Sequence, residues 1–340
     1  MAKDSGISSI NISEGGFDPI VAKPINTMWG VAPVAPLHLG YDSFINLQKD
    51  LLKDAKSHTV LLADNHAMMS HGLTYSEISK RATYYEVYLR HCCSLNAKYV
   101  SGSTFQTKHD YVESLYSIIS KLRFSKIKRT LSKVSKQGGV DSAYASSLLY
   151  SVMQCLDCCY LNVDTVVAGP DQQKIYRLLD DFPDAISYNS YLSRPDHYYY
   201  FPLGYDIAGK PLNQSTSSTR ISIHETRDNL EQKVRKMYAP PYDQPLEEGR
   251  VNALIEHFKY SVFPWISEPI IVSGNNGLSS KEFYTFQDFL NAYIAGEITP
   301  QQCKKSLFEY LWQRLSDIQR SVGTEICDWI SIELINGIRK

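Results

Sequence analysis

The apolar positions of the chain change their period near residue 230. Before that point, short continuous apolar runs alternate with stretches in which apolar residues recur every three to four positions. The run at 59–63 ends at Asp64 and is typical of a parallel strand buried on both faces. Further strands are predicted at 27–34, 97–103 and 163–167. This alternation favours an α/β fold, a doubly wound, Rossmann-like domain with a parallel sheet.

Helices are predicted wherever apolar residues recur at the helical period. Thr74 and Glu77 are spaced as a capping box, in which each side chain binds a backbone N–H of the first turn. The helices predicted between the strands cover 37–55, 74–94, 110–136, 142–161 and 172–182. Beyond residue 229 every predicted element is a helix, at 229–238, 250–262, 285–295 and 300–322. We therefore predict a loose N-terminal arm (1–25), an α/β domain (26–235) with a connective insertion (104–145), and a helical C-terminal domain (236–340).

Composition limits the class of protein. Of the 340 residues 43% are apolar and 21% are charged, so a core can form without disulfides or a structural metal. The 35 Lys and Arg balance 36 Asp and Glu, which excludes a globally basic nucleic-acid binder but allows a local basic patch. The seven cysteines are an odd number and are expected to be reduced thiols. No apolar run approaches the roughly 20 residues of a membrane span, so we expect a cytoplasmic protein.

The first candidate site follows the first strand, in the run W-G-V-A-P-V-A-P-L-H-L-G-Y at 29–41. His38 and Gly40 stand where a helix begins, and free N–H groups at a helix start attract phosphate. His38 can donate to a phosphate oxygen, and Gly40 allows a flat ring to lie against the backbone. A loop histidine and a closely packed glycine without a binding role is the more common reading of this spacing alone.

The second candidate site lies on the helix predicted at 142–161. Tyr150, Gln154 and Asp157 are spaced i, i+4 and i+7, so they share one helix face. Three polar groups on an otherwise apolar face either meet solvent or line a pocket. The segment 169–172 follows a strand at its carboxyl end, where open α/β sheets bind ligands.

Together these segments resemble the class I tyrosyl-tRNA synthetases of the archaeal and eukaryotic type. The resemblance covers 26–322 in order and with compatible spacing, so the motifs identify the family more strongly than any one of them does. The matching motifs are H-L-G-Y at 38–41 (the HIGH signature), L-L-A-D-N-H-A at 61–67, G-S-T-F-Q at 102–106, the Y-x-x-x-Q-x-x-D-x-x-Y-L-x-V-D run at 150–164, the G-x-D-Q-x-K run at 169–174, and E-I-T-P at 297–300.

The resemblance implies a ligase that joins tyrosine to ATP as an aminoacyl-adenylate and passes it to a tRNA. It also implies Mg²⁺ bound with ATP and a homodimer. Such an enzyme positions its substrates and stabilises phosphate charge without covalent catalysis. The implied catalytic residues are His38, Gly40, Tyr41 and Lys210. The implied substrate-binding residues are Met28, Gly30, Tyr150, Gln154, Asp157 (which would accept the phenol O–H) and Gln172. The implied ATP-binding residues are His38, Gly40, Gly169 and Asp171, and no metal ligand set is expected in the chain.

Three positions depart from the family pattern. Met28 replaces the tyrosine that contacts the substrate phenol, and methionine is a poor hydrogen-bond partner. The mobile KMSKS-type loop reads G-K-P-L-N-Q-S-T-S-S-T-R from Gly209, so only Lys210 can serve as its first lysine, and a solvated loop lysine is an equal reading. Thr299 and Gln302 replace the His and Asp that contact the anticodon.

These departures leave two alternatives open. One is a diverged paralogue that adenylates an amino acid for an acceptor other than tRNA in a biosynthetic pathway. The other is an inactive homologue that binds an amino acid or RNA. A basic stretch between Lys121 and Lys136 could meet a tRNA acceptor stem or could be a solvated helix face. Aromatic residues near it are expected at a dimer interface, namely Tyr99, Phe105, Tyr111 and Tyr116.

Overall fold

The computed structural model describes residues 9–11, 26–53, 55–130, 144–182, 192–201, 203–212, 218–274 and 280–322. The described residues fall into two compact units. Unit 1 is formed from Met1–Ala35 and Gln48–Pro202, and unit 2 from Pro36–Leu47 and Leu203–Lys340. The contacts thus group 36–47 and 203–235 with the helical part of the chain, whereas the sequence pattern placed both segments in the α/β domain.

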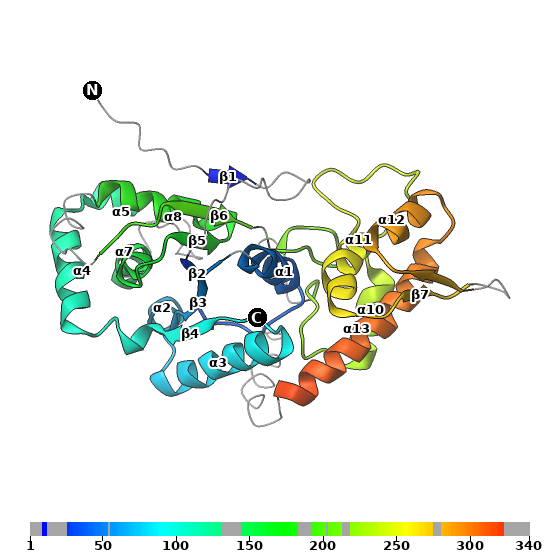
Figure 1. Cartoon of the computed structure of the whole chain (residues 1–340), viewed down its shortest axis with the longest axis horizontal. Coiled ribbons are helices and arrows are strands. Elements are labelled where there is room, and N and C mark those ends of the chain that lie inside the picture. Colours follow the sequence, from blue (N-terminus) through cyan, green and yellow to red (C-terminus); the bar gives the residue numbers. More distant parts are fainter. Residues whose placement is uncertain are drawn as a thin grey trace. The chain divides into compact units, whose positions relative to one another are not determined.

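Unit 1 is built on a parallel sheet of six strands in the order β1-β6-β5-β2-β3-β4 (Figure 1). The strand order reverses between the neighbouring strands β2 and β5, as in a doubly wound fold, so the predicted α/β class is confirmed. The strands are β1 (Ser9–Asn11), β2 (Asn26–Val31), β3 (Ser57–Leu62), β4 (Lys98–Ser101), β5 (Thr165–Ala168) and β6 (His197–Tyr200).

The strand β1 lies in the arm that was predicted to be loose, and this corrects the prediction. It pairs in parallel with β6, with Ser9 opposite Tyr198. The sequence Ser-Ile-Asn is too short to show a strand period, so the pairing depends on the backbone of β6. The strand β6 itself is rich in aromatic residues, which fit a pleated, buried surface.

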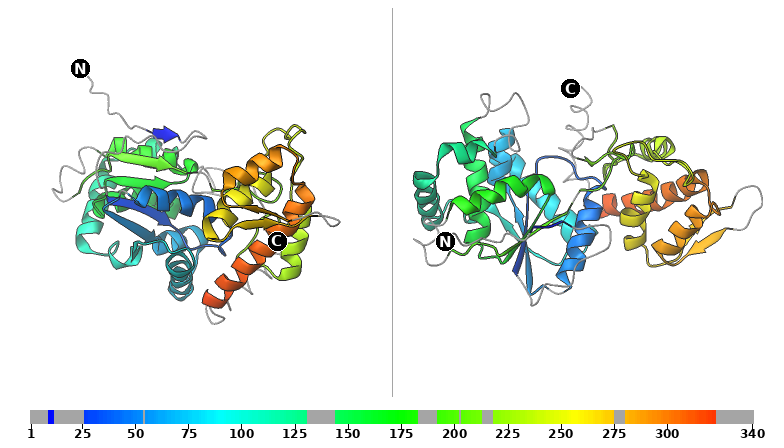
Figure 2. Two further views of the ribbon diagram at one scale, coloured as in Figure 1. Left: turned by 45° about the vertical axis from the view of Figure 1, so that its right-hand side comes forward. Right: turned by 90° about the horizontal axis from the view of Figure 1, so that it is seen from above.

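Helices cover both faces of the sheet. They are α1 (Tyr41–Leu52), α2 (Asp64–His71), α3 (Tyr75–Val87), α4 (His109–Lys121), α5 (Phe124–Lys128), α7 (Ala145–Tyr160) and α8 (Gln173–Tyr176). Figures 1 and 2 show α7 and α1 on opposite sides of the strands. On the α7 side, Met28 and Leu61 from the sheet share one apolar cluster with Leu156. On the other side, the ring of the buried residue His58 lies 2.7 Å from Thr27 Oγ1 and 3.1 Å from Gln48 Oε1 of α1.

Most helix predictions agree with the structure, with shifted ends. The capping box before α3 is present, with Thr74 N–H donating to Glu77 Oε2 at 2.8 Å and Glu77 N–H to Thr74 Oγ1 at 3.4 Å. The helix predicted at 110–136 is instead two helices, α4 and α5, because the backbone at Leu122 is extended. Residues 131–136 of that prediction lie outside the described residues. The helix predicted from residue 37 begins only at Tyr41.

Unit 2 consists mainly of helices, as predicted. They are α10 (Arg227–Lys236), α11 (Ala253–His257), α12 (Phe286–Ile294) and α13 (Pro300–Val322). The bounds of α13 match the predicted helix, and it lies against α10 and α11 through buried Leu307, Leu311 and Leu315. An antiparallel pair, β7 (Ile270–Val272) and β8 (Lys281–Phe283), was not predicted, because strands of three residues show no clear period. None of the described helices has the length and apolarity needed to cross a membrane.

Candidate active site

The polar face of α7 meets the turn after β5. Gln154 Nε2 donates to Gln172 Oε1 at 3.1 Å, and Gln172 Nε2 donates to Asp171 Oδ2 at 2.5 Å. Burial raises the pKa of the Tyr150 phenol to about 12, and the charges of Asp157 and Asp171 add to this increase. The structure therefore brings together five residues that the sequence placed in the substrate and ATP sites.

Asp157 is the most deeply buried of these residues, with 1% of its surface exposed. Both of its carboxylate oxygens accept from Gln106 Nε2, at 2.8 and 2.9 Å, and Oδ1 also accepts from the Tyr111 hydroxyl at 2.7 Å. Burial raises the pKa of the Asp157 carboxyl to about 7, although the bonds from Gln106 and Tyr111 lower it. The carboxyl group therefore titrates close to neutral pH.

A second acidic group orients the residues around Asp157. Asp64 follows β3, and its Oδ1 accepts the backbone N–H groups of Asn65 and Ser103 at 2.9 and 2.8 Å. Asn65 Nδ2 then donates to Gln106 Oε1 at 2.9 Å, so the amide nitrogen of Gln106 faces Asp157. These bonds connect the carboxyl ends of β3 and β4 to α7.

His66 completes this end of the pocket. Its Nε2 lies 3.8 Å from Asp157 Oδ2, and its ring meets the Tyr150 ring edge-on at a centroid distance of 4.6 Å. Burial lowers the pKa of His66 to about 4, so the ring is neutral at pH 7 and the contact is not an ion pair. Among the described residues neither ring nitrogen has a hydrogen-bond partner.

Sequence reasoning assigned no role in the pocket to three residues that contact Asp157. Gln106 and His66 stand in motifs that resemble the family, and that is the only signal that could have singled them out. Tyr111 was expected at a dimer interface together with Phe105, and this expectation is wrong for both. Tyr111 is completely buried and Phe105 is 4% exposed, because their rings pack against each other and against Tyr160.

The first strand contributes Met28 and Gly30. Met28 pairs with Thr59 and Val166 on the neighbouring strands and is 1% exposed. Its thioether accepts hydrogen bonds only weakly, so it offers no strong partner to a phenol. Gly30 is exposed near the carboxyl end of β2.

In the turn after β5, Gly169 lies against the side chain of Asp171. A Cβ atom at Gly169 would lie 2.5 Å from Asp171 Oδ1. The carboxylate therefore occupies the space that a side chain at Gly169 would need. Asp171 itself is exposed, as expected for a group that would bind ribose hydroxyls.

The H-L-G-Y segment lies in unit 2, where its backbone pairs with a distant strand-like segment. Leu39 N–H donates to the Ile221 carbonyl at 2.9 Å, and Ile223 N–H donates to the Leu37 carbonyl at 3.1 Å. This pairing keeps the backbone of 37–39 extended, so α1 begins only at Tyr41. A Cβ at Gly40 would lie 1.7 Å from Leu212 Cδ1, so only glycine fits there.

His38 is buried beside this glycine, with its ring 4.8 Å from the Tyr41 ring. Burial, and after it the positive charge of Arg220, lowers the pKa of His38 to about 3. The imidazole is therefore neutral at pH 7 and carries one N–H donor. Its Nδ1 has no hydrogen-bond partner within the described part of the chain.

The first turn of α1 is fixed by an ion pair that sequence reasoning did not predict. Asp42 is completely buried, and its two carboxylate oxygens accept from Arg314 Nη1 and Nη2 of α13 at 2.5 and 2.7 Å. Arg314 also donates to the Ser261 carbonyl at 3.0 Å and lies over the Trp265 ring at 3.9 Å. The residues after the H-L-G-Y segment are thereby attached to α13.

Lys210 is exposed, and its position is fixed through the backbone. Its N–H donates to Asp206 Oδ1 at 2.9 Å, beside Gly209, which has a positive φ of 74°. Residues 213–217 of the KMSKS-type loop lie outside the described residues. The catalytic role of the Lys210 side chain therefore stays a prediction.

Thr299 and Gln302, at the positions of the anticodon contacts, form a capping box at the start of α13. The Thr299 N–H and hydroxyl donate to Gln302 Oε1 at 2.9 and 2.8 Å, and Gln302 N–H donates to Thr299 Oγ1 at 3.3 Å. Their polar groups already serve the helix start. Neither side chain is positioned mainly to contact an anticodon base.

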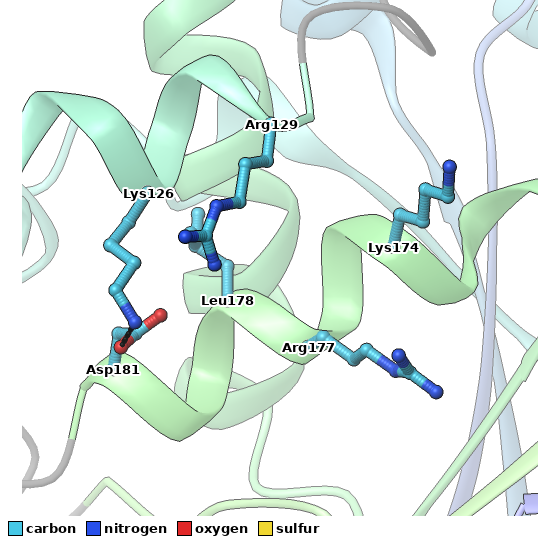
Figure 3. Close-up of a pocket in the computed structure, with 6 residues that line it drawn as sticks. All are labelled: Lys126, Arg129, Lys174, Arg177, Leu178 and Asp181. Atoms are coloured by element: carbon cyan, nitrogen blue, oxygen red, sulfur yellow. Dashed lines mark ion pairs between the residues drawn. The ribbon is translucent and has the colours of Figure 1, made fainter.

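A pocket of about 440 Å³ on unit 1 is lined by four cations and one acid (Figure 3). Lys126 and Arg129 come from the segment around α5, and Lys126 forms an ion pair with Asp181 at 2.8 Å. Lys174, Arg177 and Leu178 complete the wall. The excess of positive charge suits an anionic ligand such as a nucleic-acid phosphate.

The remaining expectations for the surface of unit 1 have mixed outcomes. Of the aromatic residues expected at a dimer interface, Tyr116 is 67% exposed, whereas Tyr99 is partly covered by the Arg90 guanidinium at 4.4 Å. Phe124, nearby in sequence, is also exposed, at 58%. Within the described ranges no three His, Cys, Asp or Glu side chains gather as a metal site, and the cysteines there are free thiols.

Comparisons with known proteins identify the family of the chain. The family model of class I tRNA synthetases (W and Y) matches residues 22–316. The tyrosine–tRNA ligase of Methanoculleus marisnigri is 27% identical over 300 residues, which cover 88% of this chain and 91% of that protein. The corresponding ligase of Halorubrum lacusprofundi is 29% identical over 290 residues, covering 83% and 86%.

Solved structures extend the comparison. The tyrosyl-tRNA synthetase of Archaeoglobus fulgidus complexed with L-tyrosine has a TM-score of 0.74 and 26% identity, over 89% of this chain and 91% of that one. A tryptophanyl-tRNA synthetase from Aeropyrum pernix has a TM-score of 0.67 at 15% identity, over 88% and 78%, and shows the shared fold alone. The chain belongs to the class I tRNA synthetases of the tryptophan and tyrosine family.

Proposed function

We propose that the chain is a tyrosine–tRNA ligase, which activates tyrosine with ATP and transfers it to tRNA. The observation that carries this proposal is the buried carboxyl group of Asp157 at the end of a polar helix face. A carboxylate there accepts a phenol O–H, and phenylalanine would leave it without that partner. A hydrogen bond to a charged group contributes about 1.5–3 kcal/mol, so the pocket favours tyrosine.

The other end of the α7 face suits the amino-acid backbone. The Tyr150 hydroxyl and the amide oxygens of Gln154 and Gln172 are acceptors for the substrate ammonium group. The bond between the two glutamine side chains limits their rotation, which lowers the entropy lost when tyrosine binds. With the phenol at Asp157 and the ammonium group at Tyr150, both ends of the substrate would be held.

ATP would be bound by His38 and Gly40 of the H-L-G-Y segment and by Gly169 and Asp171 after β5. The neutral His38 ring donates one N–H to a phosphate oxygen, and the carboxylate of Asp171 accepts from the ribose hydroxyls. In the adenylation step a carboxylate oxygen of tyrosine attacks the α-phosphorus while the bond to pyrophosphate breaks. Mg²⁺ would enter bound to the phosphates, and we assign no side chain to it.

The tRNA acceptor end would meet the basic pocket around Arg129 and Lys174. Phosphate contacts from such cations position the nucleic acid without reading its sequence. A homodimer would use the exposed aromatic residues Tyr116 and Phe124 on unit 1. We expect the enzyme to act in the cytoplasm, where tRNA is charged.

The proposal is tested by ATP–pyrophosphate exchange across the twenty amino acids, followed by charging of total tRNA with labelled tyrosine. We expect exchange with tyrosine only, and tyrosine on tRNA. The double variant Lys126→Ala/Arg129→Ala should lower charging while leaving exchange unchanged, because exchange needs no tRNA. Exchange without charging would indicate the diverged paralogue. Absence of exchange with every amino acid would reject the proposal in favour of an inactive binding protein.

A further inference from the structure

The KMSKS-type loop lacks the charge that its place in the reaction requires. Between Lys210 and Arg220 the sequence P-L-N-Q-S-T-S-S-T contains neither lysine nor arginine. Breaking the bond to pyrophosphate concentrates negative charge on the departing oxygens, and cations are the usual means of stabilising it. A side-chain charge for this step would therefore come from a residue at the edge of the loop.

Arg220 is the residue at the far edge, and the fold holds it against the H-L-G-Y segment. The next residue, Ile221, accepts the backbone bond from Leu39, and Ser222 pairs with His38 in an isolated bridge. The Arg220 carbonyl accepts from Lys233 Nζ at 2.5 Å. The backbone of Arg220 is thus fixed by the pairing of the next two residues and by the bond from Lys233.

The guanidinium group also points toward this segment. Arg220 Nη2 lies 3.5 Å from the Leu212 carbonyl oxygen, and the Leu212 side chain fills the space next to Gly40. Burial is the largest cause of the lowered pKa of His38, and the positive charge of Arg220 is the next. Arg220 therefore acts electrostatically on the His38 ring. The side chain is partly exposed, and an anion could reach it.

The other cations near Arg220 are less suited to this role. Lys233 is committed to an ion pair with Glu225 and to the Arg220 carbonyl, and only 16% of its side chain is exposed. Lys210 is turned by Gly209 and bonded to Asp206 through its backbone. A guanidinium presents a planar fork that matches two phosphate oxygens, which an ammonium group does not.

We propose that Arg220 binds the phosphates of ATP beside His38 and stabilises the departing pyrophosphate in place of a loop lysine. The tyrosine carboxylate forms its bond to the α-phosphorus, and the electron pair of the broken bond leaves on pyrophosphate, where the guanidinium neutralises charge. The inference rests on the proposed function for its catalytic part. Nucleotide binding by Arg220 stands independently of it.

The test compares Arg220→Ala and Arg220→Lys with Lys210→Ala, which removes the rival cation, and with Arg235→Ala as the matched control, an exposed arginine on α10. We expect Arg220→Ala to lower the rate of tyrosine-dependent ATP–pyrophosphate exchange by about 100-fold, in the range seen when one charge-stabilising group is removed. Arg220→Lys should restore part of this rate, and Arg235→Ala should change it less than threefold. Tyrosine affinity, measured by calorimetry, should be the same in all variants if their fold is intact.

Binding of α,β-methylene-ATP gives a readout that needs no catalysis. We expect Arg220→Ala to weaken it about tenfold and Arg235→Ala to leave it unchanged, since one charged hydrogen bond contributes about 1.5–3 kcal/mol. If the wild-type chain shows no exchange but this binding depends on Arg220, the proposed function and the catalytic part of the inference fail, and nucleotide binding by Arg220 holds. Equal binding by wild type and Arg220→Ala, or loss of exchange only in Lys210→Ala, would overturn the inference.

Discussion

The amino-acid pocket of unit 1 and the H-L-G-Y segment of unit 2 are held in place by different means. In the pocket, side chains bind one another, from Asn65 through Gln106 to Asp157. The H-L-G-Y segment is held instead by backbone hydrogen bonds to 221–223 and by one buried ion pair at Asp42. The pocket therefore depends on the identity of its residues, whereas the segment depends mainly on its shape.

This difference bears on how the two regions can change in sequence. A side-chain network fails when one partner is lost, and the pocket departs from the family pattern only at Met28. A segment positioned by its backbone tolerates new neighbours, and the loop after Lys210 has lost its cations while 37–39 stays paired. Substrate recognition would then be retained more strictly than the means of stabilising phosphate.

The largest expected effect tests the support of the H-L-G-Y segment. Replacing Asp42 by Ala leaves the Arg314 guanidinium buried without its carboxylate, which should lower the free energy of unfolding by about 3–5 kcal/mol. Urea denaturation measures it. Asp50→Ala is the control on the same helix, because its pair with Lys53 is exposed and should contribute less than about 1 kcal/mol. Equal losses in both variants would show that the segment does not depend on Arg314.

The next effect tests the side-chain network of the pocket. Asp157→Ala should weaken tyrosine binding by about 100-fold, because a charge-assisted hydrogen bond to the phenol is lost. Phenylalanine binding should change much less, and the ratio of the two affinities is the quantity to measure by calorimetry. Asp157→Asn keeps the shape and separates the effect of charge from that of packing. An unchanged ratio would remove Asp157 from the phenol site.

Buried neutral histidines occur in both regions and give a pH dependence. The folded-state pKa of His38 is about 3, and those of His58, His66, His224 and His257 are about 4, each below the ordinary value of 6.5 because of burial. The unfolded chain takes up protons first, so their stabilisation is present above pH 6.5 and is lost as the pH falls toward 4. At pH 5.5 each should cost about 1 kcal/mol.

Asp157 acts in the opposite sense. Its folded-state pKa is raised to about 7, so it favours folding at low pH and loses this contribution as the pH rises through 7. The free energy of unfolding lost through the five histidines exceeds the free energy gained through one aspartate. Urea unfolding should therefore show lower stability at pH 5.5 than at pH 7.5. Equal or greater stability at pH 5.5 would mean that these histidines are accessible to protons in the folded chain.

The smallest effect concerns Met28, the departure within the pocket. Met28→Tyr should tighten tyrosine binding by about fivefold, the contribution of one added hydrogen bond to the phenol. Met28→Leu conserves the volume and should leave the affinity nearly unchanged. Weaker binding by the tyrosine variant would indicate that the new ring occupies the space of the ligand.

The sequence predicted the elements whose signals are local and long. The 23 residues of α13 show a sustained helical period, and its predicted bounds agree with the structure. The spacing of Tyr150, Gln154 and Asp157 likewise predicted their shared face. The short strands β7 and β8 left no such pattern.

Contacts between distant residues could not be predicted. Asp42 and Arg314 are 272 positions apart, and no local period marks either residue as part of an ion pair. Tyr111 was assigned to a surface because aromatic residues cluster there in sequence, yet its partner Asp157 is 46 positions away. A single sequence shows which residues are unusual, but the fold decides which of them meet.

The buried carboxyl group of Asp157 has a thermodynamic consequence for ligand binding. Because its pKa lies near 7, a sizeable fraction of the free protein carries a proton there at neutral pH. A phenol donates a stronger hydrogen bond to the ionised form, so binding would favour release of that proton to the medium. The heat of tyrosine binding would then depend on the ionisation enthalpy of the buffer, and the affinity would rise with pH through the neutral range.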